Sequence, residues 1–443
     1  IVQVRQVIAR RLGMTVKRGS LKVSEWKREI IGTNLYGVDI KPEAIEIAKL
    51  RMWLSLVVDV PNIEDVEPLP NLDYKLMCGD SLISTINGET LIPDPTKTQQ
   101  GMLNVTPIQQ AIQPLLELQQ QYFDAQAEER QQLREQILEA EANVFRVAVR
   151  DRKQHYLTKQ RHLEEDIQRM GNASKSQQKE LEEILETLTE LDKFAEQVET
   201  GERSLSFFQY HLHFRDVFIQ KGGFDIVVAN PPYIRHQKIE KSYKNTLKSD
   251  FSCYDKYADL YVYFYERAID LLKLNGFISF ISSNKYLRTD YGEKLRKKLL
   301  DNLFPKCLID FKDAPLFEAI AYACINIAQK TYQPSEYVDY MNWDIKIPLQ
   351  QFSKTFYLNN RSKVHKNDLP VESWYLGSKE EILILDKIKS STNKLSNHLK
   401  GLNIRYGILT GYNPAFIINQ EIKEKLISAS SKSKEVIYPL VKG

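Results

Sequence analysis

The sequence is poor in the residues that form disulfides and metal sites. Its 443 residues include four cysteines with no Cys-x-x-Cys spacing and seven scattered histidines. This pattern fits neither a disulfide framework nor a zinc site, so we expect free thiols in a reducing cytoplasm and no bound metal. The sequence also lacks an apolar run of 18 residues, so we expect no membrane-spanning helix.

Net charge is also small, at +3 for the whole chain. Residues 331–443, however, contain 16 Lys and Arg against 11 Asp and Glu, a local net charge of +5. A basic excess of this kind fits contacts to nucleic-acid phosphates. A solvated surface with a mild excess of lysine has the same composition, so charge alone permits a nucleic-acid partner without identifying it.

Residues 224–233 form the most informative segment, Phe-Asp-Ile-Val-Val-Ala-Asn-Pro-Pro-Tyr. The apolar, β-branched run at 226–229 predicts a buried strand in the middle of a parallel sheet. Asn230 follows at the carboxyl end of this strand, where open α/β sheets bind their ligands. Pro231 and Pro232 fix φ and remove two backbone donors, so the loop offers carbonyl oxygens without competing N–H groups. These features suit the recognition of an amine.

An exocyclic amino group on a base is a poor nucleophile because its lone pair is delocalised into the ring. If the Asn230 side-chain oxygen and the Pro231 carbonyl each accept one N–H, the nitrogen moves toward tetrahedral geometry and its lone pair is freed. Tyr233 can stack on the flat base beside them. The alternative is an ordinary Asn-Pro turn that closes a strand. Because a cationic product amine loses its proton readily, we assign no general base, and nearby His236 has no catalytic role in this scheme.

The Asn-Pro-Pro-Tyr segment resembles the fourth motif of amino-group methyltransferases that use S-adenosylmethionine, [Asn/Asp/Ser]-Pro-Pro-[Tyr/Phe/Trp]. The Asn form with Tyr is typical of N6-adenine DNA methyltransferases, although some protein-glutamine and RNA-guanine methyltransferases share it. Flanking segments resemble the large γ-class enzymes that are fused to, or act as, type IIG restriction–modification enzymes: residues 27–30, 51–56, 211–218, 259–266, 276–281 and 407–416. The resemblance implies a prokaryotic enzyme that flips adenine out of double-stranded DNA and methylates its N6. In that family Asn230, Pro231, Pro232 and Tyr233 would be the catalytic residues.

Two earlier predicted strands, at 34–39 and 74–78, each end next to a carboxylate. Asp39 can accept both ribose hydroxyls of a nucleoside, or it can cap the helix that begins at Pro42. The resemblance implies that Asp39 and Ile40 bind S-adenosylmethionine. It also implies that Asp80 binds the adenine amino group of this cofactor. Ser81 and Leu82 would then line the ring.

Without the family, the segment Gly79-Asp80-Ser81 is a turn. The resemblance also implies a second aromatic that faces the flipped base, within residues 317–328. Tyr322 is the nearest candidate, and a tyrosine of the core fits the same pattern.

The length predicts two or three domains. After residue 82 the pattern changes to long polar helices, with a near-heptad stripe in residues 181–198 and a turn at 171–174. We expect an α/β, Rossmann-like methyltransferase core in two parts, 1–103 and 201–330, interrupted by a helical insertion at 104–200. Residues 331–443 would begin a target-recognition domain. The leucine stripe of the insertion fits core packing and also fits contacts to DNA or to a partner.

The first motif of the resembled family, a Gly-rich loop after the first strand, has no counterpart before Asp39. We therefore expect a fragment whose partners include its own missing N-terminal and C-terminal regions. An RNA or protein amino-methyltransferase, or a non-catalytic DNA-binding fragment, remains an alternative. The sequence around Glu421 and Lys423 lacks the Pro-Asp strand of a nuclease, so no nuclease is placed here.

Overall fold

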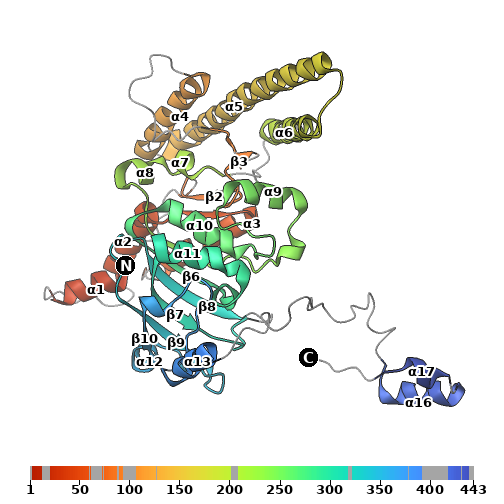
Figure 1. Cartoon of the computed structure of the whole chain (residues 1–443). Coiled ribbons are helices and arrows are strands. Elements are labelled where there is room, and N and C mark those ends of the chain that lie inside the picture. Colours follow the sequence, from red (N-terminus) through yellow and green to blue (C-terminus); the bar gives the residue numbers. More distant parts are fainter. Residues whose placement is uncertain are drawn as a thin grey trace. The chain divides into compact units, whose positions relative to one another are not determined.

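The computed structural model describes residues 2–11, 20–58, 60, 72, 74–86, 89–92, 106–125, 127–200, 208–317, 322–377, 379–391, 418–430 and 432–438. The chain divides into two compact units, Ile1–Leu376 and Gly377–Gly443. The strands found in the described residues all belong to the first unit (Figure 1). No helix in the described ranges is long and apolar enough to cross a membrane.

The larger sheet of the described residues has six strands in the order β10-β9-β7-β8-β6-β5. Strands β5 and β6 are parallel, β8 runs antiparallel to both β6 and β7, β7 and β9 are parallel, and β10 is antiparallel to β9. Ala229 at the end of β5 pairs with Phe280 of β6, so the carboxyl ends of these two strands lie side by side. The bounds are β5 Phe224–Ala229, β6 Leu272–Ser283, β7 Phe304–Asp310, β8 Ala323–Gln329, β9 Tyr337–Asn342 and β10 Ser362–His365.

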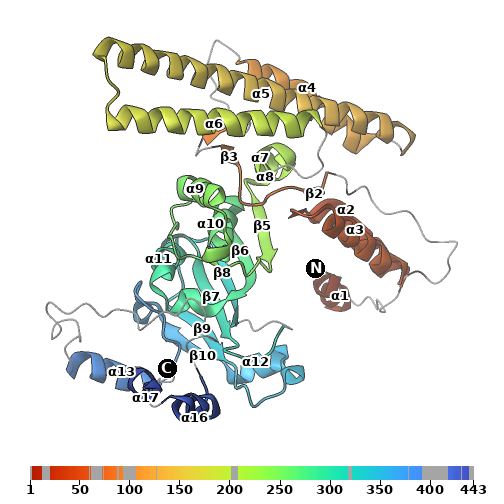
Figure 2. The same cartoon turned by 90° about the vertical axis from the view of Figure 1, so that its right-hand side faces the viewer.

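Helices cover this sheet, which confirms the predicted α/β class. Helix α10 (Tyr261–Leu271) packs on β6 and β5, and α11 (Glu293–Asn302) packs on β7 (Figure 2). Helix α10 buries three tyrosines, Tyr261, Tyr263 and Tyr265, in the main core. Helix α8 (Arg215–Lys221) contacts β5.

Strand β5 corrects the expectation of a strand buried in the middle of a sheet. It is the last strand in the order, and Ile226 and Val228 on one face are 59% and 72% exposed. Val227 and Ala229 on the other face pack against the core. The β-branched run predicts extended backbone correctly, but it carries no information on which faces are covered, because cover depends on neighbouring elements.

A smaller parallel sheet carries the two predicted carboxylates. It consists of β1 (Gly37–Asp39) and β2 (Leu76–Cys78), with Asp39 opposite Cys78. Helices α2 (Leu21–Asn34) and α3 (Pro42–Val57) pack around it through an apolar cluster that includes Ile31 and Leu76. Both predicted strands are therefore confirmed, but each is shorter than the predicted ranges 34–39 and 74–78. The first is shorter because α2 continues through Asn34.

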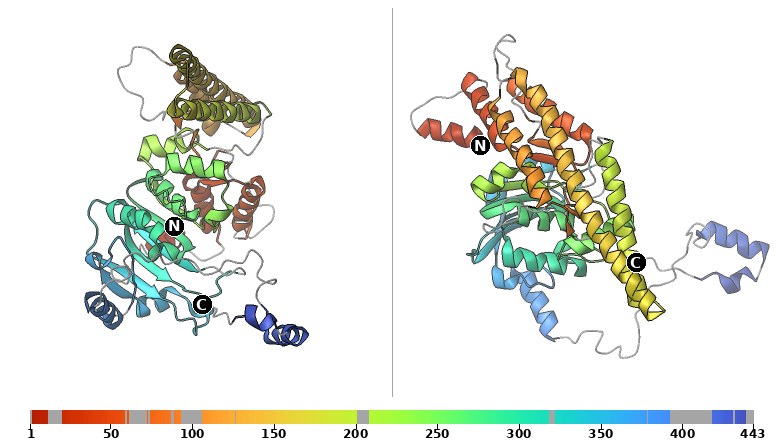
Figure 3. Two further views of the ribbon diagram at one scale, coloured as in Figure 1. Left: turned by 45° about the vertical axis from the view of Figure 1, so that its right-hand side comes forward. Right: turned by 90° about the horizontal axis from the view of Figure 1, so that it is seen from above.

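The helical insertion is confirmed as three helices, α4 (Pro107–Asp124), α5 (Ala127–Met170) and α6 (Lys175–Glu199). Two capping boxes begin α4 and α6, where Thr106 pairs with Gln109 and Ser174 with Gln177. The predicted turn between α5 and α6 contains Gly171 at φ 75°, a left-handed conformation that glycine adopts without a Cβ clash. The two helices then run back along each other (Figure 3).

Further, mostly short helices and strands complete the described residues. They are α1 (Val2–Arg11), β3 (Thr85–Ile86), β4 (Glu89–Thr90), α7 (Tyr210–His213), η3 (His236–Lys238), α9 (Lys241–Asp250), η4 (Asn284–Leu287), η5 (Asp290–Gly292), η6 (Leu349–Gln351), α12 (Lys354–Asn360), η7 (Lys366–Asp368), α13 (Lys379–Ser391), α16 (Gln420–Ala429) and α17 (Ser433–Val436). Strands β9 and β10 extend the sheet beyond residue 330. The recognition domain at 331–443 stays a prediction, and residues 407–416 lie outside the described ranges.

Candidate functional site

The Asn-Pro-Pro-Tyr loop follows β5 directly and is anchored at its far end. Asn230 is exposed, and within the described residues no hydrogen bond engages its side chain. The Ile234 carbonyl accepts a hydrogen bond from the Leu260 N–H at 3.0 Å. The His236 N–H donates to Asp259 Oδ1 at 3.1 Å. The loop is therefore tied to the start of α10, while the Asn230 amide remains available to a ligand.

Tyr233 is half-buried beside an aromatic ring that the sequence analysis did not select. Its ring centroid lies 5.9 Å from that of Phe317, with an interplanar angle of 55°. Its hydroxyl is buried without a hydrogen-bond partner in the described part of the chain. This burial raises the pKa of Tyr233 to about 12. The phenol therefore stays neutral, and its ring is held in place by packing.

Tyr322 lies just before β8 and is 45% exposed. Its carbonyl accepts a hydrogen bond from the Asn284 N–H at 2.7 Å. It is not the ring that contacts Tyr233, because Phe317 occupies that position. Phe317 lies within residues 317–328, where the resemblance implies a second aromatic, but no local signal distinguishes it from Tyr322. The stacking role of Tyr322 stays a prediction.

The two carboxylates that were predicted to bind the cofactor lie at the same edge of the β1–β2 sheet. The Gly79 N–H donates to the Asp39 carbonyl at 2.9 Å, which continues the pairing to the strand ends. Asp39 is exposed, and its Oδ1 accepts the Lys41 N–H at 2.8 Å. The capping interpretation is not supported, because Lys41 is the N-cap residue of α3 and no side chain caps that helix. The Oδ1 contact forms a turn that precedes the helix, and Oδ2 remains available for a hydroxyl. Ile40 beside it is 54% exposed.

Asp80 differs from Asp39 because it is buried and bonded to its own chain. Its Oδ1 accepts N–H groups from Leu82 at 2.8 Å and Ile83 at 3.3 Å. Its Oδ2 accepts the Tyr243 hydroxyl at 2.9 Å. Burial raises the pKa of Asp80, and these hydrogen bonds act in the opposite direction. The carboxylate therefore builds the turn at 80–83 and holds it against α9.

Arg267 of α10 donates hydrogen bonds to the next residues of the same turn. Its guanidinium donates to the Leu82 carbonyl at 2.6 Å and to the Ser84 hydroxyl at 3.0 Å. Tyr243 and Arg267 were both missed by the sequence analysis. They lie 163 and 185 residues from the atoms that they bind, so no local pattern could have found them.

A cavity of about 230 Å³ lies between the β1–β2 sheet and β5. Its walls are mostly apolar, with two polar contributions from Ser81 and Arg267. An apolar cavity with few polar groups is the usual form of a small-molecule site. Three parts of the fold line this cavity. The β1–β2 sheet and the turn after it contribute Val38 and Ser81, β5 contributes Val228 and Ala229, and α10 contributes Phe264 and Arg267.

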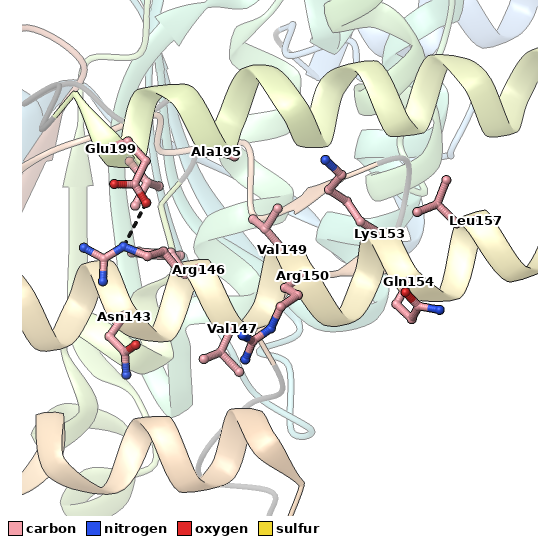
Figure 4. Close-up of a pocket in the computed structure, with 12 residues that line it drawn as sticks. Asn143, Arg146, Val147, Val149, Arg150, Lys153, Gln154, Leu157, Ala195 and Glu199 are labelled. Atoms are coloured by element: carbon pink, nitrogen blue, oxygen red, sulfur yellow. Dashed lines mark hydrogen bonds and ion pairs between the residues drawn. The ribbon is translucent and has the colours of Figure 1, made fainter.

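A second hollow, of about 520 Å³, lies between α5 and α6 (Figure 4). Its cations are mostly neutralised, since Arg146 pairs with Glu139 and Glu199 and Lys153 pairs with Asp192. All of its lining comes from these two helices and none from a strand end. In the described residues no cluster of His, Cys, Asp or Glu could hold a metal ion, and the four cysteines are free. The strand ends remain the candidate site.

The chain is similar to several proteins named as type II methyltransferases. The chain is 28% identical over 233 residues to the type II methyltransferase M.BstVI of Geobacillus stearothermophilus, covering 49% of this chain and 40% of that protein. It is 28% identical over 214 residues to the type II restriction enzyme and methyltransferase RM.Eco57I of Escherichia coli, covering 46% and 20%. The match to M.PaeR7I of Pseudomonas aeruginosa is 26% over 210 residues, covering 44% and 36%. The chain thus spans well under half the length of these relatives.

Among solved structures, the type IIG restriction endonuclease BpuSI is similar at 17% identity and a TM-score of 0.29, covering 50% of this chain and 29% of that one. The family model for the Eco57I restriction-modification methylase matches residues 33–317. That span runs from the end of α2 to Phe317 and includes β1, β2 and the Asn-Pro-Pro-Tyr loop. The chain belongs to the Eco57I restriction-modification methylase family.

Proposed function

We propose that this chain forms the catalytic core of a restriction–modification DNA methyltransferase that transfers a methyl group from S-adenosylmethionine to the N6 amino group of adenine in duplex DNA. The observation that carries the proposal is the Asn230 amide, exposed and unbonded within the described residues at the end of β5. It stands on an anchored Pro-Pro loop in a chain of the methylase family.

The chain's own contribution to the chemistry is to orient the amine. The Asn230 side-chain oxygen and the Pro231 carbonyl each accept one N–H of the adenine amino group. Both acceptors are fixed before the reaction because two consecutive prolines restrict the loop. Hydrogen bonds that strengthen as charge develops in the transition state contribute roughly 2–4 kcal/mol each.

The bond changes balance without a metal or a general base. The cofactor supplies an electrophilic methyl group on a sulfonium sulfur. The adenine nitrogen forms a bond to the methyl carbon while the carbon–sulfur bond breaks, and that electron pair stays on sulfur. The resulting cationic amine releases one proton to water. His236 is not needed for this step, and its backbone N–H already serves Asp259.

Cofactor binding is assigned to the edge of the β1–β2 sheet. The free oxygen of Asp39 would accept the ribose hydroxyls, and Ile40 would pack beside them. Ser81 would line the adenine ring on the turn that Asp80 organises. Leu82 is 1% exposed in the main core and does not line the cavity, so it would support this turn from behind. The residues present fit this assignment, because an exposed carboxylate stands next to a mostly apolar cavity lined by Ser81.

Target-base binding is assigned to the aromatic side chains of the Asn-Pro-Pro-Tyr loop and its surroundings. Tyr233, supported by Phe317, would stack on the extruded adenine, since flipped bases are commonly held by aromatic side chains. Tyr322, exposed before β8, is the second aromatic that we propose for this face.

The proposal is tested by incubating the intact protein with S-adenosylmethionine and unmethylated plasmid DNA, then measuring modified nucleosides by mass spectrometry. N6-methyladenine is the expected product. Accumulation of N4-methylcytosine would overturn the assignment of the base. Methylation of RNA or protein with no methylation of DNA would overturn the assignment of the substrate.

A further inference from the structure

A separate cavity of about 300 Å³ opens beside the Asn-Pro-Pro-Tyr loop. Three segments of the chain meet there: the residues just after the loop, the residues just before α10, and the region that follows β6. They contribute Arg235 and His236, Tyr257 and Asp259, and Lys285 and Tyr291. This cavity shares no lining residue with the one that adjoins the proposed cofactor residues.

The two cations of this cavity are not neutralised by the chain. Within the described residues, neither Arg235 nor Lys285 forms an ion pair. Lys256 adds positive charge nearby, with its ammonium 4.7 Å from the centre of the Tyr257 ring. The cavity therefore presents positive charge beside an aromatic wall that is 54% exposed at Tyr257.

The nearby carboxylates each accept a backbone N–H through one oxygen. Asp259 is buried, its Oδ1 accepts the His236 N–H at 3.1 Å, and the same oxygen lies 3.8 Å from His236 Nδ1. Asp255 Oδ1 accepts the Tyr257 N–H at 2.8 Å. These two acids stabilise the cavity walls, while the guanidinium and the ammonium remain available to an anion.

The position of the cations relates them to the candidate catalytic amide. Lys285 lies in η4, directly after the carboxyl end of β6, and Arg235 lies two residues after Tyr233. Because Ala229 of β5 pairs with Phe280 of β6, both cations lie at the sheet edge that carries Asn230. A nucleotide whose base reaches Asn230 keeps its phosphates outside the base pocket, at this same edge.

We propose that this cavity, which we call the phosphate pocket, binds a backbone phosphate adjacent to the extruded nucleotide of the target DNA strand. Arg235 provides a planar fork that can bind two phosphate oxygens, and Lys285 provides a point charge. Tyr257 packs against the adjoining sugar. The inference rests on the proposed function. It adds a phosphate contact that holds the DNA backbone of the extruded nucleotide in place.

The test uses the intact protein and a fluorescent duplex that contains the methylation site, mapped by sequencing the methylated DNA. Dissociation constants are measured by anisotropy between 50 and 200 mM salt for wild type, Arg235→Ala and Lys285→Ala. Each variant should bind about five- to twentyfold more weakly at low salt. The slope of log K against log salt should fall by about one for each lost phosphate contact.

Two matched controls define the effect. Lys22→Ala removes an exposed lysine that pairs with Glu25 on α2, and it should leave both affinity and slope unchanged. A duplex with methylphosphonate at the phosphates that flank the target adenine should weaken wild-type binding. The same duplex should weaken Arg235→Ala much less, because that contact is already absent.

The outcomes separate the two proposals. If wild type methylates no DNA, the proposed function fails. If wild type methylates DNA while both variants, with unchanged melting temperature, keep its affinity and salt slope, the phosphate pocket alone is refuted. Equal sensitivity of wild type and Arg235→Ala to the methylphosphonate would also refute it. Parallel loss of S-adenosylmethionine binding in both variants would indicate a fold defect instead of a phosphate contact.

Discussion

The ends of β2 and β5 carry the two best-defined polar side chains of the candidate site, and their environments are opposite. Asp80, after β2, is 6% exposed and accepts hydrogen bonds from Leu82, Ile83 and Tyr243. Asn230, after β5, is exposed and bonded to none of the described residues. Both positions were selected by the same signal, a polar residue after a strand. Only their environments separate a group that builds the protein from one that is free to bind a substrate.

This difference has a physical basis. A buried carboxylate without partners costs free energy, which either hydrogen bonds or protonation must offset. An exposed amide is already hydrated and costs nothing in the unbound protein. Its acceptors can therefore be reserved for a ligand. We expect substitutions at the end of β5 to change catalysis and those at the end of β2 to change folding as well.

The largest expected effect is at Asn230. Asn230→Ala removes one amine acceptor and disturbs the geometry of the second, so methyl transfer should fall by at least a hundredfold, from roughly 2–4 kcal/mol per transition-state hydrogen bond. Binding of S-adenosylmethionine, measured by calorimetry, should stay within a few-fold of wild type. Pro232→Ala is the matched control and should lose less activity. Retention of more than about a tenth of wild-type methylation would contradict the role of Asn230.

Glu141 of α5 is a buried carboxyl group without the hydrogen bonds that Asp80 accepts, so it should destabilise the fold when it ionises. It is 8% exposed, its Oε1 has no hydrogen-bond partner among the described residues, and burial raises its pKa to about 7. The folded state thus binds more protons than the unfolded state between about pH 4.5 and 7, so stability falls as pH rises through that window. The pKa difference corresponds to about 3 kcal/mol once Glu141 is ionised.

Glu141→Gln should therefore remove this loss and raise the free energy of unfolding above pH 7, with little change near pH 4.5. Urea unfolding at several pH values measures it. The free energy of unfolding of the variant is compared with that of wild type at each pH. This comparison removes the contribution of His213, whose pKa burial lowers to about 4 and which therefore also makes stability depend on pH. Glu139→Gln, at an exposed position paired with Arg146, is the control and should change stability much less. An unaltered pH dependence in Glu141→Gln would disprove the assignment.

Asp80 and Tyr243 give the next effect. Asp80→Ala leaves the Leu82 and Ile83 N–H groups and the Tyr243 hydroxyl without their acceptor, which should lower stability by about 1–3 kcal/mol. Tyr243→Phe removes one donor and should cost about 1 kcal/mol. Thermal melting measures both. If Asp80→Ala melted like wild type and only weakened the cofactor, the contrast with Asn230 would be wrong.

The smallest effect is expected at Asp39. Because its carboxylate is exposed and only Oδ1 accepts a hydrogen bond, from the Lys41 N–H, Asp39→Ala should leave the melting temperature nearly unchanged. It should raise the dissociation constant of S-adenosylmethionine about tenfold, from roughly 1.5 kcal/mol for a charge-assisted hydrogen bond. Asp39→Asn, which keeps an acceptor, should bind better than Asp39→Ala. Unchanged cofactor affinity in both variants would leave Asp39 only its turn contact to the Lys41 N–H.

Local sequence was enough to predict the elements that depend on neighbouring residues. The Asn-Pro-Pro-Tyr loop after β5, the hairpin of α5 and α6 with its turn at Gly171, and the start of α3 at Pro42 all follow from spacing within a few residues. Propensity, capping and proline geometry act over one or two turns of chain, so they leave a readable pattern.

The partners of the site residues were decided by tertiary structure. Phe317 beside Tyr233, Tyr243 on Asp80, and Arg267 on the turn after β2 come from distant parts of the chain. The exposed face of β5 likewise depends on which elements pack on it. Such contacts are set by how helices and strands pack, and packing matches shapes across long sequence separations that no local pattern records.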